Sequence, residues 1–369
     1  MKNLKLKPLN LMYNILVLAT LFYFADINIL LSIPFAFITG TILSFTAFPK
    51  LALFMSVQVE IWRNHIEESL FNDNQFMNFI SDVDGDNVIG GKVVHIPQSG
   101  GGSRVVRNRD RGVPASVRMR TDDEVLYLID EYTSDPVHIP NADTKELSYD
   151  KRESVLREEL NFLAEETAEG VLENIVKSPV GNHNVLPQTN ILITDSEIKV
   201  APSFDNATGE RDAAKIGDLQ RMKNFFKKQK SWKEGRMYAL LTPDMETQMF
   251  PADSLVTATY MGQVTEEERR SGVMYKCQGW KLLSRSTVYR LTSTGVYVPY
   301  GAEGDATDVE GSLFWNQDLV EKAKGTTEFF DDQGNPVYFG DIYSFLVRLG
   351  ARAKRKLFEG VAILRQKVA

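Results

Sequence analysis

The sequence predicts an α+β protein with a compact mixed body and two extended elements, and three patterns lead to this prediction. An unusually long amphipathic helix is expected at Tyr149–Lys177, and a thin β-hairpin with a glycine- and arginine-rich tip precedes it. After Asp212, short helices alternate with strand-like runs, as in a mixed domain. Of the 369 residues, those from Met55 onward suffice for two subdomains or one large folded unit.

Residues 1–54 are almost free of charge and differ sharply from the remainder. Asp26 is their only acid, and it separates two apolar stretches, Leu11–Ala25 and Ile27–Phe48. The second is long enough to cross a bilayer, which takes about 20 helical residues. Lysines at both ends predict cytoplasmic flanks and hence a cytoplasmic body. The alternative is that Met55-Ser56-Val57-Gln58 is a start of its own, so we expect residues 1–54 to be a non-native or membrane extension.

The body from Met55 onward is acidic. The whole chain has a net charge of −7, and residues 1–54 contribute +3, which leaves −10 on the body. This balance argues against a protein that reads nucleic-acid sequence, because such a protein would show a basic face. The single cysteine, Cys277, excludes an internal disulfide and fits a reducing cytoplasm.

The first part of the body offers no convincing metal site. Val59–Phe79 is expected to begin as a short amphipathic helix and to continue as a looser arm. The acidic run Asp82–Asn87 lacks the glycine and glutamate positions of a calcium loop and is interpreted as a polar turn. His95 and His138 lie in matching Val-His-Ile-Pro tetrapeptides, but no acid or cysteine has metal-ligand spacing, so both are expected in extended segments. We therefore predict neither a metal nor a cofactor.

Six arginines crowd a span of seventeen residues next to the Gly100–Gly102 run: Arg104, Arg107, Arg109, Arg111, Arg118 and Arg120. The flanking segments Gly91–Pro97 and Val125–Tyr132 have strand-like patterns, so this region is predicted to be a long, mobile β-hairpin. It could be a solvated loop, a phosphate-binding patch or an arm that lies across an acidic neighbouring subunit. Arginine suits both of the last two, because its planar fork makes paired hydrogen bonds to carboxylate or phosphate.

The predicted helix Tyr149–Lys177 is about 40 Å long at 1.5 Å per residue, which exceeds the needs of a small core. Its apolar residues recur at spacings of three and four, with Leu156, Leu160 and Leu163 at the start of one column. The other side is acidic and carries Glu158, Glu159, Glu165, Glu166, Glu169 and Glu173. This side could be merely solvated, but it is also a natural partner for an arginine-rich arm.

The remaining elements alternate in type. A buried-strand pattern at Gly235–Leu241 is followed by Thr242 and Pro243, which predict the N-cap and first residue of a short helix. Other helices are expected at Asp212–Lys230 and Ser312–Lys324, and a hairpin is expected around Asp332–Pro336. Further strands are expected at Trp280–Leu291, Gly295–Tyr300, Val337–Leu349 and Leu357–Arg365.

No catalytic pattern stands out, and we expect no enzyme activity. The sequence has no phosphate-loop glycine pattern, no nucleophile elbow, no zinc helix and no paired cysteine motif. Asp244 is interpreted as a helix-start acid and Glu266–Glu268 as a solvated turn.

The order of these elements resembles the major capsid proteins of tailed double-stranded DNA phages with the Hong Kong-type shell fold. The resemblance rests on local phrases and spans the body but none of residues 1–54. Those phrases are Met55–Trp62, Gly91–Pro97, Asp130–Asp143, Gly235–Pro243 and Gly340–Arg365.

The resemblance implies a domain plan. Residues 55–92 would form the N-terminal arm, 93–124 the extended loop, 125–211 the peripheral domain with the long helix as its spine, 212–311 the axial domain, and 312–369 the return of the peripheral domain. Some such proteins cross-link a loop lysine to a neighbour; here the loop carries arginine, with Lys92 only at its root, so no cross-link is expected.

The resemblance also implies a structural subunit that self-assembles into pentamers and hexamers of an icosahedral shell around double-stranded DNA. Scaffolding, portal and maturation proteins would be partners, and the shell would assemble in the bacterial host cytoplasm and become the virion capsid. The arginine arm and the acidic side of the helix are the predicted inter-subunit contact. The alternatives are a membrane-anchored cytoplasmic binding protein and an encapsulin-type compartment shell.

Overall fold

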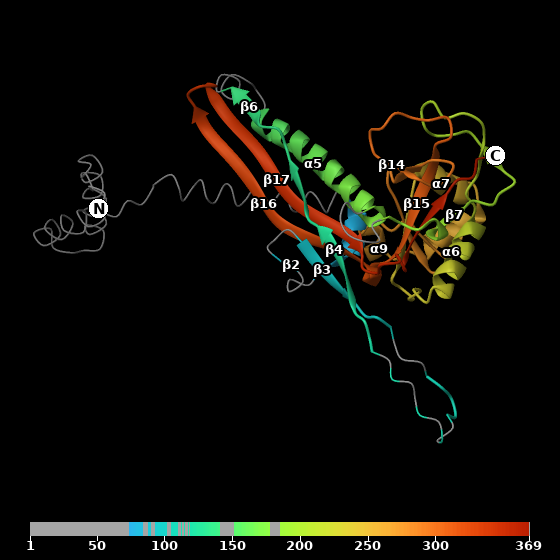
Figure 1. The fold of residues 1–369 in the computed structure, drawn as a ribbon. Coiled ribbons are helices and arrows are strands. Elements are labelled where there is room, and N and C mark those ends of the chain that lie inside the picture. The colour runs from blue at the N-terminus through green and yellow to red at the C-terminus, as the bar shows by residue number, and fades with distance from the viewer. Residues whose placement is uncertain are drawn as a thin grey trace, which may run out of the picture. The chain divides into compact units, whose positions relative to one another are not determined.

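The computed structural model describes residues 74–83, 88–89, 93–101, 105–109, 112, 114, 117, 119–140, 151–177 and 185–368 (Figure 1). The chain divides into two units, Met1–Trp62 and Arg63–Ala369, and the described residues all belong to the second. The predicted apolar stretches of residues 1–54 therefore lie outside the described residues. Within the described part of the chain, no helix has the length and apolar character needed to cross a bilayer.

A long two-stranded hairpin forms the centre of one sheet. Strands β16 (Val320–Asn335) and β17 (Gly340–Ala353) pair antiparallel, which confirms the hairpin expected around Asp332–Pro336. Gly334 lies in the register shift near the end of β16 with a φ of 68°, a conformation that favours glycine. Three short strands complete the sheet: β1 (Ser81–Asp82) along β16, and β5 (Asp130–Thr133) and β6 (Val137–Pro140) along β17.

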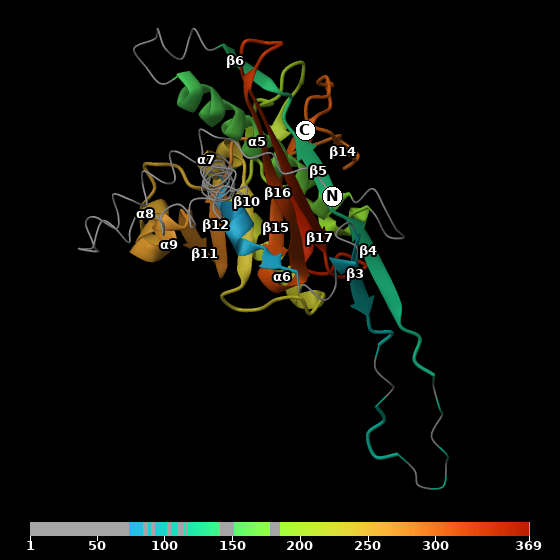
Figure 2. The ribbon, with the colours of Figure 1, turned by 90° about the vertical axis from the view of Figure 1, so that its left-hand side faces the viewer.

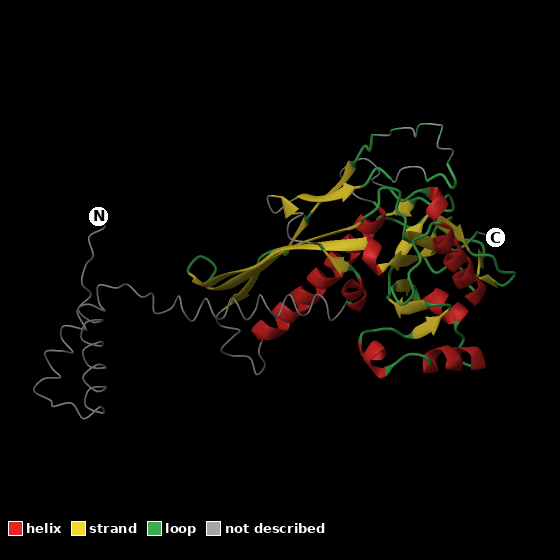
Figure 3. Cartoon of the chain, turned by 90° about the horizontal axis from the view of Figure 1, so that it is seen from below, coloured by secondary structure: helices red, strands yellow, loops and turns green. Residues whose placement is uncertain are grey.

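The predicted long helix is present as α5 (Lys151–Val176), and it packs against β17 and β5 (Figures 1 and 3). Its predicted apolar side faces the protein. The buried residues are Leu156, Leu160, Leu163, Ala164, Thr167, Ala168, Val171, Leu172, Asn174, Ile175 and Val176. The spacing of apolar residues therefore identified both the helix and its inner face.

An eight-stranded sheet forms the centre of the compact body, with the path β11-β12-β10-β15-β13-β14. Strand β18 pairs with β15, and β7 pairs with β18. The bounds are β7 Ile191–Ile193, β10 Met237–Leu241, β11 Tyr275–Cys277, β12 Trp280–Ser284, β13 Tyr289–Leu291, β14 Tyr297–Val298, β15 Val309–Asn316 and β18 Val361–Arg365. Strands β8 (Lys199–Val200) and β9 (Arg211–Asp212) make a separate pair.

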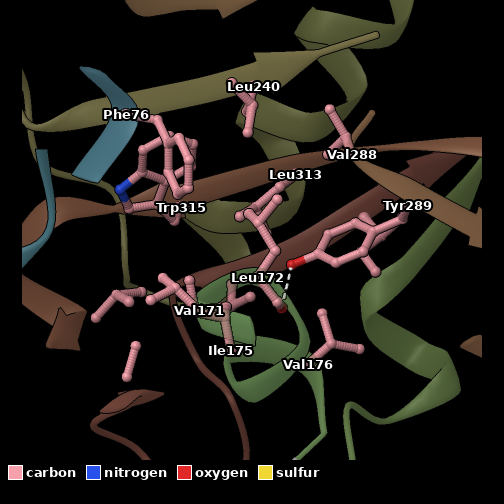
Figure 4. Packing of buried hydrophobic residues seen from close by; sticks show 14 of the residues in the cluster. Phe76, Val171, Leu172, Ile175, Val176, Leu240, Val288, Tyr289, Leu313 and Trp315 are labelled. Atoms are coloured by element: carbon pink, nitrogen blue, oxygen red, sulfur yellow. Dashed lines mark hydrogen bonds between the residues drawn. The ribbon is translucent and has the colours of Figure 1, made fainter. Parts of the chain in front are cut away.

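The two faces of this sheet bury different hydrophobic clusters. In β10, Tyr238 and Leu240 join the cluster that includes Leu172 of α5, whereas Met237, Ala239 and Leu241 join the other cluster. Figure 4 shows the first cluster, where the hydroxyl of Tyr289 donates to the Leu172 carbonyl at 2.8 Å. Because alternate residues of a strand point to opposite faces, a wholly buried strand such as β10 must be apolar throughout.

Four short helices accompany this sheet: α6 (Ile216–Lys228), α7 (Pro243–Met249), α8 (Leu255–Gly262) and α9 (Glu266–Arg270). Helices α6 and α7 contribute to the cluster on the face opposite α5. The predicted cap is confirmed, since the Thr242 side chain accepts from the Met245 amide and Pro243 opens α7.

Two expectations are wrong. The helix expected at Ser312–Lys324 is instead the end of β15, a 3-10 turn at Gln317–Leu319 and the start of β16, because this segment is buried on both faces between neighbouring strands. The turn expected at Glu266–Glu268 is instead helix α9, which Thr265 and Glu268 cap reciprocally. The 311/312 boundary of the predicted domain plan falls inside β15.

The last part of the expected N-terminal arm is buried. Residues Gln75–Phe79 form a 3-10 helix whose Phe76 and Met77 enter the α5-side cluster. The Asn74 side chain donates to the Ala164 carbonyl of α5 at 3.0 Å, and the Trp315 indole donates to the Phe79 carbonyl at 3.0 Å. The earlier part of that expectation, Val59–Asp73, lies outside the described residues, as do Asp84–Asn87 of the expected polar turn.

The arginine-rich segment leaves the body between two paired strands, as predicted. Strands β3 (Val93–Gln98) and β4 (Asp123–Leu128) pair antiparallel, and β2 (Val88–Ile89) pairs with β3. Figure 2 shows the chain continuing beyond the ends of β3 and β4. His95 lies in β3 and His138 in β6, so both histidines occupy extended segments.

Candidate inter-subunit surfaces

We call residues 99–122, which connect β3 to β4 and carry the arginines, the arm. At its root, Asp122 joins the two ends of the arm. One oxygen of its carboxylate accepts from the Gly100 amide at 2.9 Å. Arg120 pairs with the same carboxylate through two hydrogen bonds, Nε to Oδ1 at 2.5 Å and Nη2 to Oδ2 at 2.8 Å. These contacts raise the pKa of Arg120 and lower that of Asp122. Arg120 is thus engaged within its own chain.

The described residues of the arm beyond this root are exposed. Arg107 and Arg109 are exposed, whereas Arg104, Arg111 and Arg118 lie outside the described residues. Apolar side chains are exposed as well: Val105 is 93% exposed, Val117 100% and Met119 87%. The arm therefore presents both positive charge and apolar surface, and the sequence analysis considered only the charge.

The acidic side of α5 consists of two parts with different surroundings. Glu158, Glu165 and Glu166 are exposed. Glu159, Glu169 and Glu173 are half-buried, and the Thr287 hydroxyl lies 3.4 Å from a Glu169 carboxylate oxygen. Burial raises the pKa of Glu169, so this carboxyl is less suited than the exposed ones to an inter-subunit ion pair.

A shallow groove lies between α5 and β5. It is lined by Glu131, Tyr132, Thr133, Ser134, Glu159, Phe162, Leu163 and Glu166. Phe162 is 65% exposed and is the large apolar side chain among these acids. Phe162 and Glu131 were not among the predicted contact residues. Phe162 could have been recognised from the sequence, because it is apolar but does not fall on the inward-facing apolar side of the predicted helix.

A second exposed apolar group lies at the turn of the β16–β17 hairpin. Val337, Tyr338 and Phe339 are all exposed, and Phe339 has a φ of 53°. The ring of Tyr338 lies 5.9 Å from that of His138 in β6. An aromatic group exposed at the end of a long hairpin is unusual for a monomeric protein and marks this turn as a candidate contact surface.

No family model and no curated protein matches the sequence, but solved structures match the fold. The capsid of Ralstonia phage GP4 is 14% identical, with a TM-score of 0.53 over 79% of this chain and 87% of that one. The chain has the Hong Kong-type capsid fold. The fold predicted from element order is therefore confirmed.

Two further capsid structures share this fold. The capsid asymmetric unit of cyanophage Pam1 is 8% identical, with a TM-score of 0.53 over 80% of this chain and 92% of that one. The capsid of cyanophage P-SCSP1u is 15% identical, with a TM-score of 0.50 over 78% and 86%. At such identities the likeness concerns the fold, and the contacts of this chain must be argued from its own residues.

Proposed function

We propose that this chain is the major capsid subunit of a tailed double-stranded DNA phage, self-assembling through pentamers and hexamers into an icosahedral shell. The observation that carries the proposal is the arm, whose Val105, Val117 and Met119 are exposed and are not covered by the described residues of the chain. Burying apolar surface is the main favourable term in protein association. The capsid fold of the body supports the same function.

The proposed contact places the arm of one subunit on α5 of the next. The exposed arginines would pair with Glu158, Glu165 and Glu166, and the arm's valines and methionine would cover Phe162. Arginine matches carboxylate geometry through paired hydrogen bonds. Each exposed ion pair contributes only about 0–1 kcal/mol, so the contact depends on repetition over many copies.

A charge-swap experiment tests this contact in the full-length chain. Replacing Arg107, Arg109 and Arg111 by Glu should prevent particle formation, because three attractions become repulsions. Replacing Glu158, Glu165 and Glu166 by Arg should do the same. Combining both sets in one chain should restore particles, since every subunit supplies both surfaces. Electron microscopy and sedimentation measure the particles.

The matched control replaces Arg269, Arg270 and Arg355 by Glu, which changes the net charge equally at exposed positions outside the arm and α5. If the arm triple assembles as well as the unmodified chain, the arm-to-helix contact is wrong. The contents of purified particles discriminate the alternatives: packaged duplex DNA supports a phage capsid, and an enclosed enzyme supports an encapsulin-type compartment. Full-length chain in a membrane pellet that resists salt and alkaline washing would instead support the membrane-anchored alternative.

A further inference from the structure

The segment 221–236 of the compact body is strongly basic although the chain as a whole is acidic. Between Arg221 and Arg236 the sequence has seven basic residues and one acid, Glu234, in a chain of net charge −7. We call this group the α6 basic surface. Its members are Arg221, Lys223, Lys227, Lys228, Lys230, Lys233 and Arg236.

The fold holds these side chains outward. Leu219, Met222 and Phe226 of α6 are buried against the eight-stranded sheet, which turns Lys227 and Lys228 to the exterior. Lys230 follows the helix with a φ of 58° and is also exposed. The surface lies on the face of the sheet opposite α5, since the two helices join different hydrophobic clusters.

Internal contacts account for only part of the charge. Arg221 pairs with the buried Asp218, and Lys233 pairs with Asp318. Lys223 lies 5.0 Å from the centre of the Trp232 ring. By contrast, Lys228 and Lys230 form no ion pair with the described residues of the chain.

Helix stability does not explain so many cations. Lysines near a helix C-terminus interact favourably with the helix dipole, but this effect falls off within the last turn. Like charges three or four positions apart on a helix repel each other, as Lys223 and Lys227 do. This repulsion costs the isolated subunit free energy, which a polyanionic partner would offset.

We propose that the α6 basic surface contacts the phosphates of duplex DNA inside the shell; this inference rests on the proposed capsid function. Five of its seven cations are lysines, which act on phosphates as flexible point charges. The acidic remainder of the chain keeps the contact weak and independent of sequence. Such a contact is consistent with the acidic net charge, which is not typical of a protein that recognises a particular nucleic-acid sequence.

The test measures DNA binding by unassembled full-length subunits. Fluorescence anisotropy of a labelled duplex of random sequence gives the affinity over a range of NaCl concentrations. Log affinity falls with log salt, and each lost phosphate contact should make this negative slope shallower by about 0.9. The variant Lys228→Gln/Lys230→Gln should therefore reduce the magnitude of the slope by about 1.8 and weaken binding. The matched control Arg269→Gln/Arg270→Gln removes two exposed charges from α9 and should leave the slope unchanged.

The inference is overturned if the lysine variant and the unmodified chain have the same slope. It is also overturned if the lysine variant stops forming particles while its DNA slope stays unchanged, since the surface would then contact protein. The proposed function fails separately: if the unmodified chain forms no shells but the slope difference holds, the DNA contact stands and the capsid assignment does not.

Purified particles give a second measurement. Amine labelling of Lys228 and Lys230 should be weaker in DNA-filled particles than in empty ones, because packaged DNA would cover them. Equal labelling in both kinds of particle would contradict a contact with packaged DNA.

Discussion

At the scale of single residues, Glu310 in β15 is a buried acid whose environment opposes its charge. It is 6% exposed, and the Thr242 hydroxyl donates to its carboxylate at 2.7 Å. Burial is the main cause that raises its pKa, and the nearby Asp244 carboxylate raises it further. The folded chain therefore holds the proton of Glu310 more tightly than the unfolded chain does.

This environment predicts the pH dependence of stability. Below the unfolded-state pKa of about 4.3, the Glu310 carboxyl is neutral in both the folded and the unfolded chain, so its burial carries no penalty for a charge. Because the folded-state pKa is raised, the stability of the fold decreases as the pH rises through that pKa. Glu310→Gln should keep the bond from Thr242, remove the penalty and increase the free energy of unfolding at pH 7. It should have little effect at pH 4.

Urea unfolding of dispersed chain at several pH values measures this effect. Glu267→Gln, an exposed change on α9, is the control and should leave the pH profile unaltered. A Glu310→Gln chain that is less stable than the original at pH 7 would show that the carboxylate is needed in its charged form.

At the scale of elements, α5 combines a structural face and a proposed contact face. Leu172 is fully buried beneath the eight-stranded sheet, whereas Phe162 on the same helix is 65% exposed. Two alanine substitutions on one helix can therefore separate folding from assembly.

Leu172→Ala should lower the free energy of unfolding by about 2–5 kcal/mol, because it leaves a cavity in the main core. Phe162→Ala should change it by no more than about 0.5 kcal/mol but should reduce particle yield, since the proposed cover of the arm would be lost. Chemical denaturation and particle counts by electron microscopy give the two readouts. Normal particle yield from Phe162→Ala would remove Phe162 from the proposed contact.

Elements also show where sequence patterns mislead. The columns of α5 predicted its position and inner face, because a helix against one surface must repeat every three to four residues. Residues 309–316 carry no comparable signal, since all eight are buried and the strand has no exposed face. The periodicity of apolar residues does not distinguish a short buried strand from a buried helix segment, and the helix expected at Ser312–Lys324 was wrong for this reason.

At the scale of the whole molecule, residues 1–54 give the remaining prediction. Their composition, almost free of charge, differs from that of the body, and the capsid resemblance begins at Met55. We expect mass spectrometry of purified particles to find Met55 or Ser56 as the first residue. Particles whose subunits all retain Met1 would contradict this and would make the apolar segment part of the shell.

The sequence by itself determined the long helix, the arginine arm, the closing hairpin and the α+β capsid fold, because each depends on local periodicity, turn residues or their order. Tertiary structure decided what local patterns do not carry. It placed Phe76 and Met77, which were expected in the N-terminal arm, in the core, set β15 beside β10 and β18, and joined the Gly100 amide to the Asp122 carboxylate. Strand pairing, burial and these hydrogen bonds join residues that are distant in the chain, so their partners become known only when the chain is folded.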